Sequence, residues 1–340
     1  MMLRIGLVGL GFMGRTHLEN YVRLEAEGVA IKVVALCDID PVKLEGNAVA
    51  GNIDTGDSAI DFNLYAKYAS VSEMIEKEQL DYVDLALPTY LHRDITIECL
   101  NKGLHVLCEK PMASNPQECA EMIEAAEANG KQLMIGQCLR FWPAYVYLKE
   151  AVEKGTYGNV TSGYFYRGGA TPTWGPWLID KEKSGGALLD MHVHDIDMVN
   201  WLFGKPGSVS CLARNVVPGS GYDVVSTNYL YGDGKVINAQ ADWTLEGDYG
   251  FDMQFRVNFE KANIIFGASG LKVNLNDAPG FSPELSPEMG YYLELKYFIE
   301  TLLAGESVTT ASPASTRETI EIAVAEIASA DQHGAWVEVK

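Results

Sequence analysis

The chain has 340 residues, which is more than one hydrophobic core usually holds, so two domains are expected. Hydrophobic residues make up 47% and charged residues 21% of the chain, as in an ordinary soluble globular protein. The formal net charge of −20, without a basic cluster, excludes nucleic acid and anionic membrane surfaces as expected partners.

Targeting and redox signals indicate the cytoplasm. The chain enters a strand pattern at once without a charged leader, and no stretch approaches the ~20 apolar residues of a membrane span. The cysteines lack C-x-x-C spacing and are expected to be buried thiols in a reducing compartment. They are Cys37, Cys99, Cys108, Cys119, Cys138 and Cys211.

A glycine motif follows the first expected strand. An apolar run at 3–8 leads into Gly9, Gly11 and Gly14, and residues 15–28 can continue as a helix. In this arrangement the first glycine permits a tight turn, the second lets the backbone approach a pyrophosphate, and the third lets the helix pack on the sheet. The helix directs its N-terminal N–H groups and positive dipole end at the anion.

The context of this motif supports a dinucleotide site. With 33 glycines in the chain, a lone triplet is weak evidence, but the order of strand, glycines and helix is the one that the motif requires. Phe12 and Met13, between the second and third glycines, are therefore expected at the cofactor as well.

An acidic residue ends the second expected strand. The run 32–37 is followed by Asp38, whose carboxylate can accept hydrogen bonds from an adenosine ribose 2′-OH and would repel a 2′-phosphate. No Arg or Ser follows in 39–41 to receive a phosphate, so NAD is favoured over NADP. The alternative is that Asp38 merely caps a helix beginning near Pro41.

The first 136 residues alternate strand and helix patterns, which predicts a nucleotide-binding α/β domain with a doubly wound, mostly parallel sheet. Further helices are expected at 41–50, 72–78, 91–102 and 116–129, and further strands at 81–87, 104–108 and 132–136.

Residues 137–340 are expected to form an α+β domain with an open antiparallel sheet. Helices are expected at 144–154, 291–303 and 313–330, and β segments at 160–167, 209–215, 226–231, 235–244, 251–259 and 263–266. One face of such a sheet needs covering, so we expect a homodimer or homotetramer.

Lys110 is the first candidate for chemistry. It follows the strand that ends at Cys108, and the carboxyl ends of parallel strands border the cofactor crevice. An ammonium group there can hold a substrate hydroxyl and stabilise negative charge on its oxygen. The alternative is an ordinary surface lysine.

The second candidate lies after two glycines at 185–186. If these open a helix, Asp190, His194 and Asp197 share one face, and a carboxylate one turn from an imidazole suits a general base. A structural helix cap is an alternative. A metal site is disfavoured, because His192 and His194 would point to nearly opposite sides of a helix.

Taken together, the glycine motif, Glu109-Lys110-Pro111 and the segment that runs from the glycine pair to His194 resemble the Gfo/Idh/MocA oxidoreductase family, over essentially the whole chain. The family has an N-terminal Rossmann domain and a C-terminal open-sheet domain. The resemblance implies that Lys110, Asp190 and His194 are its catalytic lysine, aspartate and histidine.

The same resemblance adds residues at the cofactor and substrate. Pro88, Thr89 and His92 are similar to the family's segment beside the nicotinamide, and Glu109 with Lys110 belongs to its lysine motif. Candidate substrate contacts, for which core or interface positions are the alternative, are Arg140, Arg167, Trp174, Trp177 and His192. Many members have glycine at the position of His192, and a histidine there changes the shape near the substrate.

These observations predict an NAD-dependent dehydrogenase acting on a secondary alcohol of a sugar, inositol or sugar derivative. His194 would be the general acid/base and Lys110 would position the reacting oxygen. Two alternatives stay open: an NAD-using glycoside hydrolase of the same fold, and a non-catalytic NAD-dependent sensor.

Overall fold

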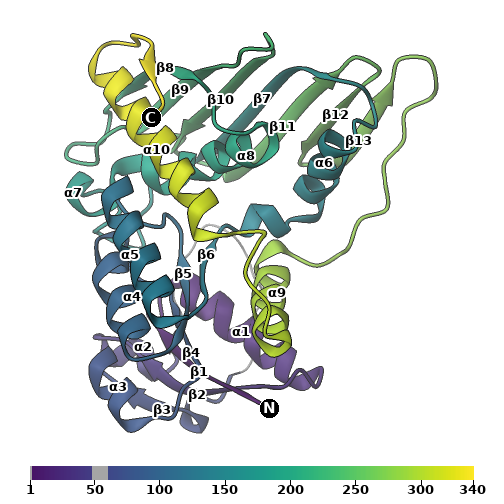
Figure 1. The fold of residues 1–340 in the computed structure, drawn as a ribbon. Helices are drawn as coiled ribbons and strands as arrows, with labels where there is room; N and C mark the ends of the chain where they lie inside the picture. Colours follow the sequence, from purple (N-terminus) through teal and green to yellow (C-terminus); the bar gives the residue numbers. More distant parts are fainter. Residues whose placement is uncertain (1, 48–59) are drawn as a thin grey trace. The chain divides into compact units, whose positions relative to one another are not determined.

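The computed structural model describes residues 2–47 and 60–340, and these form two compact units (Figure 1). The first unit runs to Cys138 and also contains Met289–Arg317. The second unit comprises Leu139–Glu288 and Glu318–Lys340.

A parallel six-stranded sheet forms the centre of the first unit, in the order β3-β2-β1-β4-β5-β6. Its strands read as nearly continuous apolar runs because helices cover both faces of a sheet of this kind. The strands are β1 (Leu3–Val8), β2 (Ile31–Cys37), β3 (Ala66–Tyr68), β4 (Tyr82–Leu85), β5 (His105–Glu109) and β6 (Leu133–Gly136).

The strand order positions the first candidate site. The chain turns back between β1 and β4, and in doubly wound sheets ligands bind beyond the carboxyl ends of the strands at such a reversal. The loops after β1, β4 and β5 carry the glycine motif, Pro88-Thr89 and Lys110 respectively. Three separate sequence motifs therefore lie at one edge of one sheet.

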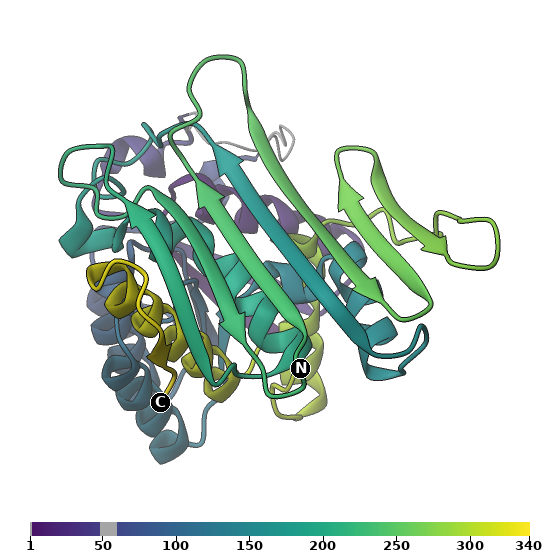
Figure 2. The ribbon, with the colours of Figure 1, turned by 90° about the horizontal axis from the view of Figure 1, so that it is seen from above.

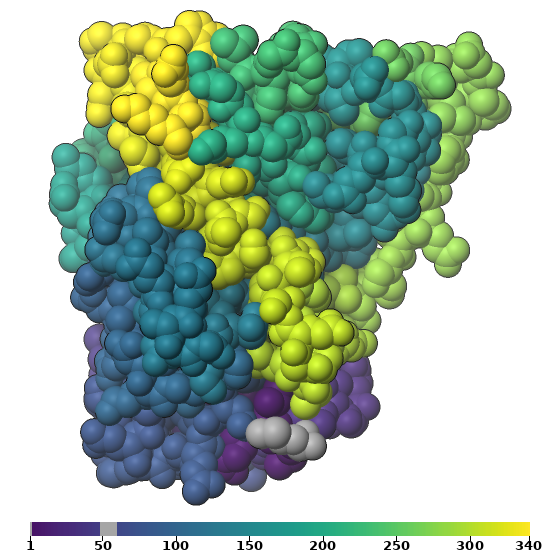
Figure 3. Space-filling view, in the orientation of Figure 1, coloured from purple at the N-terminus to yellow at the C-terminus, as the bar shows by residue number. Residues whose placement is uncertain are grey.

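The helices of this unit include one from the C-terminal part of the chain. They are α1 (Phe12–Ala26), α2 (Pro41–Leu44), α3 (Val71–Lys77), α4 (His92–Asn101), α5 (Pro116–Asn129) and α9 (Gly290–Ala304). Helix α9 packs on α1, where the Arg23 guanidinium lies 4.2 Å from the centroid of the Tyr292 ring. The space-filling view shows this yellow-green segment directly against the purple N-terminal part (Figure 3).

The packing of α9 corrects the expected domain boundaries. The sequence suggested one continuous second domain over 137–340, but residues 289–317 belong to the first unit. An amphipathic helix shows that it buries a face without showing which domain supplies the partner surface. The division between units falls within α10 (Pro313–Asp331).

The second unit has an eight-stranded, mostly antiparallel sheet in the order β13-β12-β11-β7-β10-β9-β8-β14, in which β7 and β10 pair in parallel. Figure 2 views the face of this sheet opposite helices α6 and α8. The strands are β7 (Val160–Gly169), β8 (Ser208–Arg214), β9 (Val224–Leu230), β10 (Val236–Asp242), β11 (Phe251–Phe259), β12 (Ala262–Gly267), β13 (Gly270–Leu275) and β14 (Val337–Glu338).

Helices cover the other face of this sheet and form the core with it. They are α6 (Pro143–Glu153), α7 (Lys181–Ser184), a π-helical turn (Leu188–His192), α8 (Val193–Phe203) and most of α10. The rings of Tyr145 on α6 and Phe255 on β11 meet edge to face with centroids 4.9 Å apart.

Several elements differ from the expectations. The helix expected at 41–50 is only α2, since residues 45–47 are not helical and 48–50 lie outside the described residues. Strands β3, β13 and β14 were not expected; β3 and β14 have three and two residues, too few to show an alternating pattern. The glycine pair at 185–186 opens a π-helical turn and not an α-helix.

All six cysteines are buried free thiols, as expected. In the part of the chain that the structure describes, no helix is long and apolar enough to cross a membrane.

Candidate functional site

The glycine loop in the first unit has room for a ligand at one glycine only. A Cβ on Gly9, which has φ +87°, would lie 2.2 Å from the Ala86 carbonyl oxygen, and one on Gly14 would lie 1.8 Å from the Gly9 carbonyl oxygen. The fold itself therefore requires these two glycines. A Cβ on Gly11 would meet nothing within 4 Å, so the space in front of Gly11 stays open for a ligand.

Helix α1 presents its positive end beside this space. Gly11 is its N-cap residue without a side-chain cap, and no acidic residue stands in its first turn. The backbone N–H groups of Phe12 and Met13, in that first turn, have no intrahelical acceptor, so they can donate to an anion. Both observations fit a dinucleotide pyrophosphate.

Asp38 lies at the carboxyl end of β2 and is anchored by the backbone. Its Oδ2 accepts the N–H of Leu10 at 2.7 Å, and its Oδ1 accepts the N–H of Asp40 at 2.8 Å. The alternative reading of Asp38 as a helix cap is wrong, because the cap of α2 is Asp40, which accepts the N–H of Val42. Lys43 Nζ lies 3.6 Å from Asp38 Oδ2, a cation that the sequence argument did not anticipate.

The loop after β4 offers a buried hydroxyl. Thr89 is 3% exposed, and its Oγ1 finds no hydrogen-bond partner among the described residues. Pro88 directly precedes the short 3₁₀ turn at Thr89–Leu91. A buried hydroxyl without a partner costs free energy, so this one fits a cofactor group as its missing partner.

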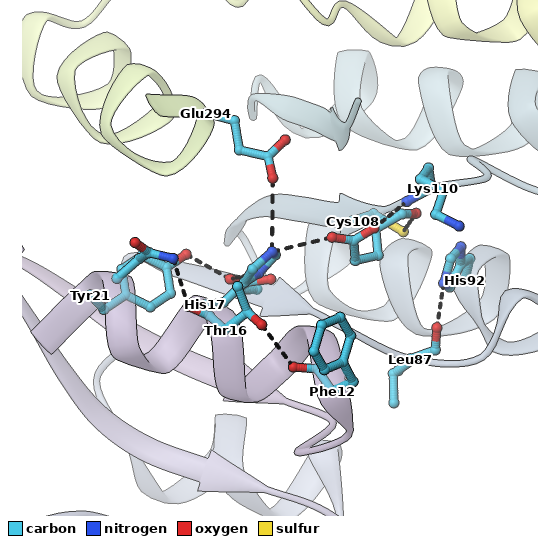
Figure 4. A network of polar contacts seen from close by, with 12 residues as sticks. Phe12, Thr16, His17, Tyr21, Leu87, His92, Cys108, Lys110 and Glu294 are labelled. Atoms are coloured by element: carbon cyan, nitrogen blue, oxygen red, sulfur yellow. Dashed lines mark hydrogen bonds and ion pairs between the residues drawn. The ribbon is translucent and has the colours of Figure 1, made fainter. Parts of the chain in front are cut away.

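His92 joins two of the strand-end loops. It is fully buried, with Nε2 2.8 Å from the Leu87 carbonyl oxygen (Figure 4). Its Nδ1 lies 2.7 Å from the Pro111 carbonyl oxygen. Burial lowers the pKa of His92, and the nearby Lys110 ammonium adds to this effect. The imidazole thus holds the loops together from inside, and its expected contact with the cofactor stays a prediction.

Lys110 follows β5 as a half-buried residue between buried neighbours. Its backbone N–H donates to Glu109 Oε2 at 2.9 Å, and the Lys110–Pro111 peptide bond is cis. Glu109 is 6% exposed, and its other carboxylate oxygen lies 3.2 Å from His17 Nε2. The Glu109 carboxylate thus turns inward, whereas the Lys110 side chain stays partly accessible.

The second unit carries Asp190 and His194 on a buried helical segment. From Ala187 to Asn200 every residue is buried except these two. Asp190 lies in the π-helical turn and His194 in the first turn of α8. Asp197, which the sequence placed on the same face, is fully buried. The accessible groups of this segment are thus one carboxylate and one imidazole.

Two arginines expected to contact substrate are instead held by carboxylates of α8. Arg140, 1% exposed, donates from Nε and from a terminal guanidinium nitrogen to the two oxygens of Asp197, at 2.8 and 2.7 Å. Arg167, 3% exposed, donates from Nε to Asp195 at 3.1 Å. Buried charges require such partners, so these arginines hold α8 to its surroundings.

His192 also differs from its expected role as a substrate contact. Its side chain is 0% exposed, and its Nε2 lies 3.1 Å from Glu326 Oε2 of α10. Trp174 is exposed and Trp177 half-buried in the loop before α7, so both keep accessible ring surface.

Sequence reasoning missed a buried polar cluster in the first unit, formed by His17, Tyr21, Asp84 and Glu294 together with Glu109 (Figure 4). One signal was available: Asp84 stands inside the apolar strand β4, and buried carboxylates need partners. Glu294 gave no such signal, because it lies on α9, which the sequence placed in the second domain.

Two family models match the chain. The model described as "Oxidoreductase family, NAD-binding Rossmann fold" matches residues 3–137, and the GFO/IDH/MocA C-terminal domain matches residues 145–265. Both matches agree with the folds of the two units.

Individual relatives give the same assignment. The scyllo-inositol 2-dehydrogenase (NADP(+)) of Bacillus subtilis is 33% identical over 266 residues, which are 73% of this chain and 75% of that protein. The inositol 2-dehydrogenase of Salmonella typhimurium is 30% identical over 208 residues, which are 60% of this chain but only 56% of that protein.

The fold is shared with a solved levoglucosan dehydrogenase in complex with NADH and levoglucosan. The two structures align with a TM-score of 0.86 over 100% of both chains at 22% identity. From the two family matches and the Bacillus relative, this chain belongs to the Gfo/Idh/MocA family of oxidoreductases, with an NAD-binding Rossmann domain and the family's C-terminal domain.

Proposed function

We propose that this chain is a dehydrogenase that oxidises a secondary alcohol of a sugar, inositol or sugar derivative. The observation that carries the proposal is that Asp190 and His194 are only half-buried on a segment that is otherwise buried from Ala187 to Asn200. A partly accessible carboxylate and imidazole on a buried helix suit proton transfer, whereas packing would favour apolar residues there. The names of the inositol and levoglucosan dehydrogenases support the substrate class.

The residues divide the chemistry between them. His194 takes the proton of the substrate hydroxyl, since an imidazole has a pKa suited to this near neutral pH. Lys110 donates a hydrogen bond to the reacting oxygen and stabilises its developing negative charge. Asp190 orients His194 or holds the substrate. NAD, when bound, accepts the hydride at C4 of its nicotinamide ring.

The cofactor preference follows from Asp38. Its anchored carboxylate is placed to accept hydrogen bonds from a ribose and disfavours a 2′-phosphate. Lys43 beside it reduces that repulsion, so we propose a preference for NAD and not strict exclusion of NADP.

Substrate contacts in this proposal come from the accessible side chains. Trp174 and Trp177 offer flat apolar surface for a sugar ring, and of the five expected contacts they are the two that are not buried.

We also propose that a second copy of the chain covers the open face of the eight-stranded sheet (Figure 2). This face carries half-buried aromatic residues, including Tyr164 and Tyr166, whose rings stack with centroids 6.5 Å apart. Interfaces are enriched in tyrosine. Light scattering in solution should give the mass of a dimer or tetramer, and a monomer would contradict the proposal.

The test of the reaction is NADH formation with a panel of inositols, aldoses, amino sugars and nucleotide sugars, with NADP in parallel. Lys110→Ala should lower turnover by about 10²–10³-fold, since it removes the group that stabilises the oxyanion, while NAD binding is retained. Lys102→Ala, at an exposed lysine after α4, is the matched control and should keep full turnover.

Retained turnover in Lys110→Ala would contradict the role of Lys110. Sugar release without net NADH would favour the glycoside hydrolase alternative, and ligand binding without turnover would favour the sensor.

A further inference from the structure

A buried cluster of ionisable side chains lies beneath Lys110. His17 of α1, Asp84 of β4 and Glu294 of α9 are each 0% exposed, and Glu109 of β5 is 6% exposed. His17 Nδ1 lies 2.8 Å from Asp84 Oδ2, and His17 Nε2 lies 3.2 Å from Glu109 Oε1 and 3.9 Å from Glu294 Oε1 (Figure 4). None of these groups except Glu109 entered the proposed mechanism or the sequence argument.

The carboxylates around His17 favour its imidazolium form. Nδ1 is hydrogen-bonded to Asp84, and Nε2 lies 3.2 Å from Glu109 in an ion-pair contact without hydrogen-bond geometry. Only the imidazolium form presents an N–H to both carboxylates. Asp84 Oδ2 also accepts the hydroxyl of Tyr21 at 2.7 Å. A neutral imidazole would leave one carboxylate facing a lone pair.

The charges of the cluster lead to the same form. Three carboxylates and one neutral imidazole would place three negative charges in a buried region, at a large desolvation cost. One proton on His17 and a second on Glu294 leave a single net negative charge, next to the ammonium of Lys110. Both oxygens of Glu294 lack a hydrogen-bond partner among the described residues, as suits a neutral acid better than a carboxylate.

The pKa directions agree with this assignment. Burial opposes protonation of His17, but Asp84 and Glu109 outweigh it, so the pKa of His17 lies well above 6.5. Burial, with the charges of Glu109 and Asp84, raises the pKa of Glu294 well above 4.5, although His17 opposes this. Burial raises the pKa of Glu109, but His17 and Lys110 lower it further, below its usual value.

We propose that His17 is a positioning residue for Lys110: as a permanent imidazolium it bridges Asp84 and Glu109 and fixes the Glu109 carboxylate. The other oxygen of that carboxylate accepts the Lys110 backbone N–H. The bridge therefore fixes the backbone of Lys110, directly after β5, and with it the start of the Lys110 side chain. The catalytic part of this inference rests on the proposed role of Lys110, whereas the protonation state of His17 does not.

A divalent cation is the competing occupant. His17, Glu109 and Glu294 each offer a ligand atom, and these atoms lie within 4.8 Å of one another. A bound cation would take the Nε2 lone pair and both glutamates as carboxylates. The two states therefore differ in the proton on Nε2, the proton on Glu294 and the metal content.

The first measurement is nitrogen-15 NMR of histidine-labelled protein at about pH 8, where an unperturbed imidazole is neutral. We expect one imidazolium, with both ring nitrogens protonated, assigned by its disappearance in His17→Gln or, if that variant does not fold, by its shift in Glu294→Gln. Metal analysis of the same sample should find no stoichiometric divalent metal. A neutral His17 or a bound metal would overturn the proposal.

Stability against pH gives a second readout. A group whose pKa is higher in the folded than in the unfolded state stabilises the fold at pH values below its unfolded-state pKa. This stabilisation is lost as the pH rises through its folded-state pKa. For His17 this loss begins above pH 6.5 and for Glu294 above pH 4.5. The unfolding midpoint should therefore decrease as the pH rises into the alkaline range. Glu294→Gln, which mimics the neutral acid, should flatten this fall. A slope unchanged in Glu294→Gln would overturn the neutral state of Glu294.

Kinetics then test the link to Lys110. Glu109→Gln weakens the bridge and should lower kcat by about 10–100-fold, since a displacement of about 1 Å can cost 10²-fold, while NAD affinity is retained. Glu294→Gln should stay close to wild type in kcat. Equal kcat in Glu109→Gln and wild type would overturn the positioning role. If the wild type itself turns over no substrate, the proposed function fails, and the NMR result still decides the state of His17.

Discussion

Each unit of this chain combines a histidine with acidic residues, and the two combinations differ in burial. In the first unit His17 and Asp84 are both 0% exposed, held between α1, β4, β5 and α9. In the second unit Asp190 and His194 are the accessible residues of an otherwise buried segment. The same residue types therefore form a fully buried cluster in one unit and a partly accessible pair, proposed for proton transfer, in the other. Burial distinguishes the two roles.

The contrast is repeated within α8 and the turn before it. His192 and His194 stand two residues apart, but His192 is 0% exposed against Glu326, whereas His194 is accessible. Asp195 and Asp197 are likewise committed to Arg167 and Arg140. The buried pairs hold this segment in place, whereas His194 and Asp190 are only half-buried.

The largest expected effect comes from the accessible histidine. His194→Ala removes the proposed general base and should lower kcat by about 10²–10⁴-fold. The free energy of unfolding should fall less than in the variants of the buried pairs, because the His194 imidazole is only half-buried. Steady-state kinetics and urea denaturation measure the two quantities. Loss of stability with normal turnover would reverse the comparison between the two units.

Arg140→Met should lower the free energy of unfolding. It removes the bidentate partner of Asp197, which stays buried with the Thr319 hydroxyl at 2.8 Å as a remaining donor. Breaking a buried pair from one side costs about 3–5 kcal/mol, measured by urea denaturation. The double variant Arg140→Met with Asp197→Leu should recover part of this loss. A raised KM at unchanged stability would restore Arg140 as a substrate contact.

His192→Ala should have a smaller effect in the same direction. The variant leaves the Glu326 carboxylate buried without its imidazole neighbour, although the Thr227 hydroxyl still donates to it at 3.0 Å. The expected loss is about 1–3 kcal/mol in the free energy of unfolding. A variant of wild-type stability whose KM for substrate rises would show instead that His192 contacts the substrate.

Residues close together in sequence were the predictable ones. The glycine motif, Asp38 and Lys110 could be read because each follows directly on a strand, and the ends of parallel strands meet at one edge. The partner of Arg140 could not be read, since Asp197 lies 57 residues further along. His17 and Glu294 meet only because α9 returns to the first unit.

The π-helical turn at Leu188–His192 was equally unpredictable. The spacing from Asp190 to His194 suits one face of an α-helix, and nothing in the residues marks the wider turn. The prediction that Asp190 and His194 take part in chemistry now rests on their partial accessibility. The prediction that Asp197 shares their face is wrong, because Asp197 is buried. The pattern of residue types thus predicted a helical segment here but not the geometry of its backbone.

The smallest expected effect separates a cofactor contact from a structural hydroxyl. Thr89 Oγ1 is buried without a partner among the described residues, so Thr89→Val should leave the free energy of unfolding unchanged or slightly raised. If the hydroxyl bonds the cofactor, the variant loses about 0.5–1.5 kcal/mol of NAD binding, a two- to tenfold rise in Kd by calorimetry. Thr96→Val, at a buried threonine of α4, is the matched control and should leave the Kd unchanged. Equal Kd values in both variants would contradict a cofactor contact at Thr89, and its hydroxyl would then be an unpaired group that the fold tolerates.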